Sequence, residues 1–104
     1  VNKLVVEFEG GGCCFSAVTC ATPMYTRSID AKGTLSMLRK RGGIGSATDE
    51  RNPTKGWWRV FVPYCTGDAH CGNKTASYGV EHKGFVNAQS ALSWALRREG
   101  EARR

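Results

Sequence analysis

The sequence predicts an α/β fold, because two strand-like segments alternate with two helix-like segments along the chain. Residues 3–8 and 57–62 are short runs rich in branched and aromatic side chains, which indicate buried strands. Residues 29–41 and 86–98 place apolar side chains three and four positions apart, which is the period of an amphipathic helix. Strands that alternate with helices are typical of a mostly parallel sheet with helices packed on it.

The first predicted strand stops at a glycine-rich loop, Glu9-Gly10-Gly11-Gly12. Three glycines let the backbone turn sharply and leave the amide hydrogens unobstructed, which suits a loop that points N–H groups at an anion. The loop is not a nucleotide-binding P-loop, because no Gly-Lys-Ser or Gly-Lys-Thr follows it, and the six-residue dinucleotide fingerprint is also missing. Two interpretations therefore stay open for the loop alone, a tight bend and an anion-binding turn.

The first predicted helix, residues 29–41, carries Leu35 and Leu38 on one face and ends in basic residues before a pair of glycines. Residues 42–56 are rich in Gly, Ser, Asn and Pro, so we expect a surface loop there.

The second predicted strand, residues 57–62, is closed by Pro63 and leads into a polar loop that contains Asp68 and His70. Reactive residue types are dense in residues 64–73, which makes this loop the second candidate for a functional site.

A weak extended segment is predicted for residues 76–81, and the strongest helical pattern of the chain follows in residues 86–98. Asn87 lies where it could cap this helix, and Gly100 follows the last turn. The apolar positions that recur at helical spacing are Ala88, Ala91, Leu92 and Ala95.

Length and composition limit the chain to one folding unit or part of one, since it has 104 residues, 40% of them hydrophobic and 23% charged. No apolar run approaches the roughly 20 residues that a membrane-spanning helix needs. The net charge of +6 comes mainly from basic residues at the ends of the two helices, where they complement the helix dipole. Because the aromatic residues do not interleave with them, we expect no nucleic-acid partner. These basic residues are Arg39, Lys40, Arg41, Arg97, Arg98, Arg103 and Arg104.

The five cysteines are spaced in a way that indicates disulfides and an oxidising compartment. Cys14 and Cys20 are six residues apart around a turn, and Cys65 and Cys71 repeat that separation. Cys13 is the remaining cysteine, either a buried thiol or a partner for something outside this chain.

A zinc site is the alternative interpretation of part of this set, with Cys65, His70, Cys71 and His82 as four ligands. The spacing argues against zinc, because structural sites favour Cys-x-x-Cys pairs, and five residues between Cys65 and Cys71 suit a disulfide better.

Three segments in this order resemble the pectin acetylesterase and Notum family of serine carboxylesterases. They are residues 4–12 followed by Cys14 and Cys20, residues 57–70, and His82-Lys83-Gly84 with Asn87 opening the helix. The resemblance covers most of the chain. It implies that residues 1–104 form the N-terminal part of a single α/β-hydrolase domain, truncated at both ends.

The resemblance also implies roles for the candidate residues. Gly11 and Gly12 would supply backbone N–H groups to the oxyanion that forms when a serine attacks an ester carbonyl. Glu9 and Gly10 would brace that loop, and Asp68 and His70 would be supporting residues outside the catalytic triad. Cys14 and Cys20 match a cysteine pair of the family.

The chain lacks the family's Gly-x-Ser-Ala-Gly-Gly nucleophile, because no serine has glycine both two residues before it and two residues after it. We therefore expect the isolated chain to be inactive and the whole protein to be a hydrolase of carboxylic esters, acting on acetyl groups of a polysaccharide. The resemblance implies no cofactor, no metal, and a secreted or periplasmic location. Two alternatives are a disulfide-stabilised secreted module that binds an anionic polymer and the small zinc domain described above.

Overall fold

The centre of the molecule is a pair of parallel strands. The computed structural model describes residues 3–23 and 27–102. β1 (Leu4–Phe8) and β2 (Trp58–Val62) run side by side, with Leu4 opposite Trp58 and Phe8 opposite Val62. Parallel neighbours need a crossover connection, and the segment between them supplies it with α2 (Ala31–Arg39). Both predicted strands and the first predicted helix are confirmed.

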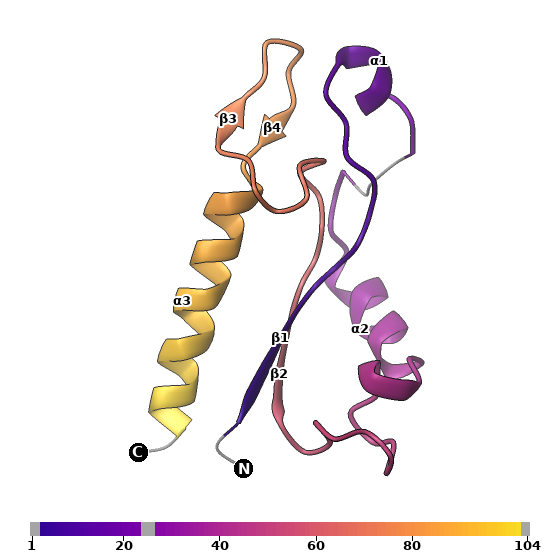
Figure 1. Ribbon diagram of the computed structural model, residues 1–104, viewed down its shortest axis with the longest axis vertical. Coiled ribbons are helices and arrows are strands. Elements are labelled where there is room, and N and C mark those ends of the chain that lie inside the picture. The colour runs from indigo at the N-terminus through magenta and orange to yellow at the C-terminus, as the bar shows by residue number, and fades with distance from the viewer. Residues whose placement is uncertain (1–2, 24–26, 103–104) are drawn as a thin grey trace.

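The two long helices lie on opposite sides of this strand pair. Figure 1 shows the strands edge-on, with α2 on one side and α3 (Gly84–Ala102) on the other. A cavity lies between the strands and each of these helices, and Arg59 and Phe61 border both cavities. Leu4 and Trp58 line a cavity with Trp94 of α3, whereas Glu7 lines another with Leu38 of α2.

The second predicted helix is confirmed and begins earlier than the periodicity indicated. α3 starts at Gly84, so Asn87 lies within its first turn and does not occupy the predicted cap position. Ala95 of this helix is 2% exposed and lines the cavity between α3 and the strands. A small side chain at this position lets the helix approach the strands closely.

Residues 76–81, predicted as one extended segment, instead form mostly the turn of a hairpin. β3 (Lys74–Thr75) pairs antiparallel with β4 (Glu81–His82). The N–H of Ala76 donates to the carbonyl of Val80 at 2.9 Å, and Gly79 has a φ of 86°, which favours glycine. This glycine supplies the reversal of direction that the pattern of polar and apolar residues did not show.

A short helix that the sequence did not predict, α1 (Ala17–Cys20), follows the glycine loop. Ser16 and Thr19 form a reciprocal capping box at its start. The predicted Cys14–Cys20 disulfide is present and ties the loop to this helix, and both cysteines are buried.

The structure does not form the second candidate disulfide. Cys65 and Cys71 are free thiols, and so is Cys13. The Sγ of Cys71 is exposed and lies 3.1 Å from the carbonyl oxygen of Ala69 in its own loop. The equal spacing of the two cysteine pairs therefore does not produce equal pairing.

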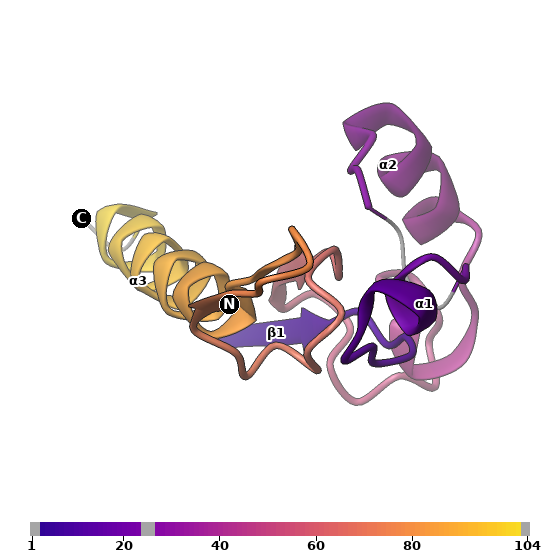
Figure 2. The same cartoon turned by 90° about the horizontal axis from the view of Figure 1, so that it is seen from above.

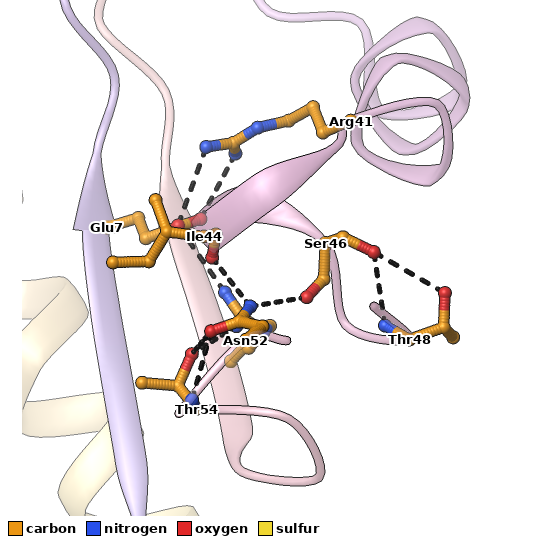
Figure 3. A network of polar contacts seen from close by, with 8 residues as sticks. Glu7, Arg41, Ile44, Ser46, Thr48, Asn52 and Thr54 are labelled. Carbon is orange, nitrogen blue, oxygen red and sulfur yellow. Dashed lines mark hydrogen bonds and ion pairs between the residues drawn. The ribbon is translucent and has the colours of Figure 1, made fainter. Parts of the chain in front are cut away.

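A polar network fastens the loop of residues 42–56 against the α2 side of the sheet (Figure 3). Asn52 is buried, and its Nδ2 donates to the carbonyl oxygens of Ile44 at 2.9 Å and Ser46 at 2.6 Å. Its Oδ1 accepts the backbone N–H of Thr54 at 3.0 Å. The loop also contains the short 3₁₀ helix η1 (Gly43–Gly45). It lies mostly on the surface, as predicted, and one buried amide organises it.

The same network reaches the first strand through a shared carboxylate. Arg41 approaches Glu7 at 3.1 Å and Arg59 approaches it at 3.4 Å. Two cations on one carboxylate join the end of α2 and both strands on this face of the sheet.

Much apolar surface stays exposed around this small core, on both long helices and on the strands. No helix among residues 3–23 and 27–102 is long and apolar enough to cross a membrane. The exposed apolar residues with the largest accessible fractions are Phe15, Val18, Leu35, Ile44, Trp58 and Leu96.

Candidate functional site

The two loops that the sequence singled out meet at one end of the sheet. Because β1 and β2 are parallel and in register, the glycine loop and the loop after β2 leave the strands at the same edge (Figure 1). The view from above shows α1 and the hairpin gathered over this end (Figure 2). In open parallel sheets, ligands bind in the crevice outside the carboxyl ends of the strands. The topology therefore places both loops where such a site would lie.

Glu9 makes the first connection between the loops. Its backbone N–H donates to the carbonyl oxygen of Val62 at 2.9 Å and extends the strand pairing by one bond. Its carboxylate Oε2 accepts the backbone N–H of Tyr64 at 2.7 Å. This carboxylate is occupied with bracing the start of the second loop.

Two side chains of the second loop hold carbonyl groups of the first. The Nε2 of His70 lies 2.8 Å from the carbonyl oxygen of Glu9, and the hydroxyl of Tyr64 donates to the carbonyl oxygen of Gly12 at 3.0 Å. The N–H of Cys14 donates to the carbonyl of Gly67 at 2.9 Å. The glycine loop is thus attached to its neighbour at both ends.

The backbone N–H groups between these two attachment points are not held by hydrogen bonds to described residues. The backbone N–H groups of residues 10–13 donate to no other residue in the described part of the chain. Unpaired N–H groups on adjacent peptides can bind an anion or stabilise a developing negative charge. The loop therefore has the donors that an oxyanion site needs, at Gly11 and Gly12 and at the residues on either side.

Asp68 organises the second loop as a shared acceptor. Its Oδ1 accepts from the hydroxyl of Thr66 at 2.5 Å and from the N–H of His70 at 3.1 Å. Its Oδ2 accepts the N–H groups of Gly72 at 2.9 Å and Gly84 at 2.8 Å. Burial alone would raise the pKa of Asp68, but the four hydrogen bonds outweigh it and lower the pKa below its usual value. The carboxylate is therefore ionised and acts as a fixed acceptor.

The chain approaches Asp68 so closely that two of these partners must be glycine. A Cβ added to Gly84 would lie 2.6 Å from the Cα of His70 and would collide with the Asp68 carboxylate. A Cβ added to Gly72 would lie 2.7 Å from the carbonyl oxygen of His82. Neither requirement was visible in the sequence, because both depend on contacts between separate segments.

The backbone beside Asp68 adopts an unusual conformation. Ala69 and His70 have φ angles of 54° and 61°, in the left-handed region that side chains other than glycine seldom adopt. Such strain persists only where the surroundings fix it, and it occurs often at functional sites. Here the turn directs the His70 ring between Phe8 and Tyr64, with ring centroids 5.1 Å and 4.8 Å away.

The residues of the zinc alternative do not come together. Both ring nitrogens of His82 are engaged, Nδ1 with the carbonyl oxygen of Thr66 and Nε2 with the hydroxyl of Tyr78, each at 2.7 Å. Within the described residues, the one cluster with three potential ligands is Cys14, Cys20 and His82. Its two sulfurs are already bonded to each other.

The basic helix ends of the polymer-binding alternative belong to two different helices. Arg39 ends α2 and Arg98 lies in α3, and these helices lie on opposite sides of the strands (Figure 1). Arg41 pairs with Glu7, and Arg98 pairs with Glu101 at 3.2 Å. Arg103 and Arg104 lie outside the described residues.

Tyr64 is the residue of this site that sequence reasoning missed. It is 2% exposed and contacts the glycine loop, the His70 ring and the backbone of Ala69. Its position directly after Pro63 could have identified it in the sequence, because a residue that follows the end of a strand must lie near the edge of the sheet.

Fold and site together define an α/β protein whose glycine loop, at the carboxyl edge of parallel strands, presents backbone amides without partners among the described residues. The family model described as Pectinacetylesterase matches residues 1–93. The chain therefore belongs to the pectinacetylesterase family, which confirms the resemblance drawn from the sequence.

Named relatives support this assignment. The chain is 36% identical over 96 residues to palmitoleoyl-protein carboxylesterase notum2 of Xenopus laevis, covering 88% of this chain and 19% of that protein. It is 34% identical over 90 residues to inactive palmitoleoyl-protein carboxylesterase notum1b of Danio rerio, covering 83% and 63%. It is 30% identical over 77 residues to pectin acetylesterase 11 of Arabidopsis thaliana, covering 70% and 19%. The chain thus spans about a fifth of the Xenopus and Arabidopsis proteins. No solved structure matches it significantly.

Proposed function

We propose that this chain is the oxyanion-hole segment of a longer carboxylic ester hydrolase, called here the parent protein. In this proposal a serine of the parent attacks the ester carbonyl and forms an acyl-enzyme. The backbone N–H groups of Gly11 and Gly12 stabilise the oxyanion. The observation that carries the proposal is the row of amides in residues 10–13, at the carboxyl edge of the sheet, that donate to nothing within residues 3–23 and 27–102.

The arrangement of α3 supports a nucleophile next to this loop. Crossovers between parallel strands are right-handed in nearly all proteins, and α2 and α3 lie on opposite faces. A parallel strand that follows α3 would therefore be added on the β1 side of the pair. That edge of β1 is unpaired in the described structure. The loop after such a strand would emerge beside the glycine loop, where a serine would meet the amides of Gly11 and Gly12.

The name of the family supports a substrate class. Pectinacetylesterases are named for acetyl esters on a polysaccharide, and we infer that the parent removes acetyl groups from such a polymer within an α/β-hydrolase domain. The Cys14–Cys20 disulfide supports a secreted or periplasmic location, because disulfides persist in oxidising compartments. The chain alone would be inactive, since it contains no nucleophile motif.

The test compares two substitutions of Gly12 in the parent protein. Gly12→Pro removes the N–H that would stabilise the oxyanion, whereas Gly12→Ala keeps it and controls for the added side chain. With p-nitrophenyl acetate and acetylated pectin as substrates, we expect Gly12→Pro to lower kcat about 100-fold to 1000-fold. We expect Gly12→Ala to cost roughly tenfold or less.

Circular dichroism and melting temperatures of both variants must match the unsubstituted parent before the rates are compared. Full activity in Gly12→Pro, or equal losses in the two variants, would show that the N–H of Gly12 is not the stabilising group. A parent that hydrolyses neither substrate would overturn the proposed activity itself. The Danio rerio relative, which is named inactive, makes this outcome important to measure.

A further inference from the structure

The hydroxyl of Tyr64 has one proton, and its neighbours determine where that proton points. The backbone N–H of Ala69 donates to this oxygen at 2.8 Å, so the hydroxyl is the acceptor in that bond. The carbonyl of Gly12, 3.0 Å away, can only accept. The hydroxyl therefore donates to Gly12, and the Sγ of Cys13 is a second, more distant acceptor at 3.7 Å.

His70 makes the equivalent contact at the other end of the loop. The carbonyl oxygen of Glu9 has no proton to give, so the Nε2 of His70 carries the hydrogen across the 2.8 Å separation. The ring is held between Phe8 and Tyr64, and its backbone N–H is bound to Asp68. Both the imidazole and the main chain that carries it are thus fixed.

Because peptide bonds are planar, these two contacts with carbonyl groups also orient the N–H groups of the same peptides. In a trans peptide the carbonyl of one residue and the N–H of the next point in opposite directions. Fixing the carbonyls of Glu9 and Gly12 therefore fixes the peptide planes 9–10 and 12–13. The two planes between them carry the N–H groups of Gly11 and Gly12, and neither N–H donates to a described residue.

We propose that Tyr64 and His70 are positioning residues that clamp both ends of the glycine loop and thereby orient the amides of Gly11 and Gly12. This inference rests on the proposed function, in which those amides stabilise the oxyanion. Three consecutive glycines are by themselves the most flexible backbone available, and donors contribute most to catalysis when they are preorganised. The clamp supplies the order that the glycines lack.

The burial of Tyr64 suits this role. Burial raises the pKa of the Tyr64 phenol above its usual value, so the hydroxyl keeps the proton that it donates to Gly12. A buried ring with a single hydroxyl is also a rigid donor, because little rotational freedom is left to it.

The decisive variant is Tyr64→Phe in the parent protein, which keeps the ring and removes the donor. Tyr78→Phe is the matched control, because it removes a hydroxyl that bonds His82 and does not contact the glycine loop. We expect Tyr64→Phe to lower kcat about 10-fold to 100-fold and to leave KM within about threefold, since the loss falls on the transition state. We expect the control to stay within about twofold in both constants.

A second variant, His70→Asn, tests the other end of the clamp and guards against misfolding of Tyr64→Phe. Asparagine tolerates the left-handed backbone of residue 70 but is too short to keep the bond to Glu9. We expect a similar fall in kcat with little change in KM. A purely structural role would instead lower the melting temperature without separating kcat from KM.

Hydrogen–deuterium exchange of the segment 9–14 provides a readout that needs no activity. We expect faster exchange of its two bonded amides, those of Glu9 and Cys14, in Tyr64→Phe and His70→Asn than in Tyr78→Phe. If a folded Tyr64→Phe keeps its kcat and the exchange of this segment is unchanged in both variants, the clamp is wrong. If the exchange rises but the parent shows no esterase activity, the clamp stands and the proposed function fails.

Discussion

The carboxylate of Asp68 accepts the backbone N–H of Gly84 at 2.8 Å, so that a loop residue caps a helix that begins sixteen residues later in the chain. The same oxygen accepts the N–H of Gly72 at 2.9 Å. A carboxylate at a helix start satisfies an orphan N–H group and meets the positive end of the helix dipole. The loop after β2 and the start of α3 are therefore one structural unit.

We expect Asp68→Ala to lower the free energy of unfolding of the parent protein by about 2–4 kcal/mol, because several donors lose a charged acceptor at once. Urea denaturation measures the change. Asp30→Ala is the matched control, since Asp30 caps α2 and, among the described residues, accepts just the N–H groups of Lys32 and Gly33. Its expected cost is about 1 kcal/mol. Equal losses of unfolding free energy in the two variants would contradict the role of Asp68 as a shared acceptor.

Acid should destabilise the parent partly through the same residue. The pKa of Asp68 is lowered in the folded state from its usual value of 3.8, so the stabilisation is complete above that pH and is lost as the pH falls toward the folded pKa. We expect the free energy of unfolding to fall less steeply below about pH 4 in Asp68→Asn than in the unsubstituted protein. Denaturation curves at a series of pH values measure both slopes, and parallel slopes would exclude this contribution.

Loss of the Cys14–Cys20 disulfide should lower the stability of the protein, because the unfolded chain is then less constrained. A disulfide that closes a loop of this length lowers the entropy of the unfolded chain and so stabilises the folded state by about 2 kcal/mol. We therefore expect the double substitution of both cysteines by alanine to lower the free energy of unfolding by about 2 kcal/mol or more, since both side chains are buried. Cys71→Ser, at an exposed free thiol, should change it by less than about 0.5 kcal/mol. Thermal melts with and without a reducing agent test this, and a melt insensitive to reduction would contradict it.

The carboxylate of Glu7 should contribute more to the free energy of unfolding than an exposed carboxylate that pairs with arginine. Its side chain is 21% exposed and lies within 3.4 Å of both Arg41 and Arg59. We expect Glu7→Gln to destabilise the parent by about 1–3 kcal/mol, because it leaves two partly buried cations without their counter-charge. Glu101→Gln removes the exposed partner of Arg98 and should cost less than about 0.5 kcal/mol. Chemical denaturation of both variants gives the comparison, and similar costs would show that burial does not strengthen the Glu7 pair.

Local patterns in the sequence predicted the strands, the two long helices and one disulfide. The run of mostly branched and aromatic residues 4–8 favours an extended strand. Ala88, Ala91 and Ala95 recur three and four positions apart, which is the period of a helix face. Cys14 and Cys20 are close in sequence, and Cys20 ends the single turn of α1, so the chain brings them together without distant contacts. The family resemblance followed from the same short segments.

The predictions that failed or were missing concern contacts between segments distant in sequence. The cap of α3 comes from Asp68 and not from Asn87, because a carboxylate from another loop reaches the first helical N–H. Cys65 and Cys71 are free, although their spacing equals that of the bonded pair.

By itself, the sequence determined where the glycine loop lies, since a strand pattern that stops at Glu9 requires a change of direction in the glycines after it. Only the tertiary structure decided how that loop is held. The register of β1 against β2 brings Tyr64 and His70 to the carbonyls of Gly12 and Glu9. Such contacts depend on distances between strands, and no periodicity along the chain encodes them.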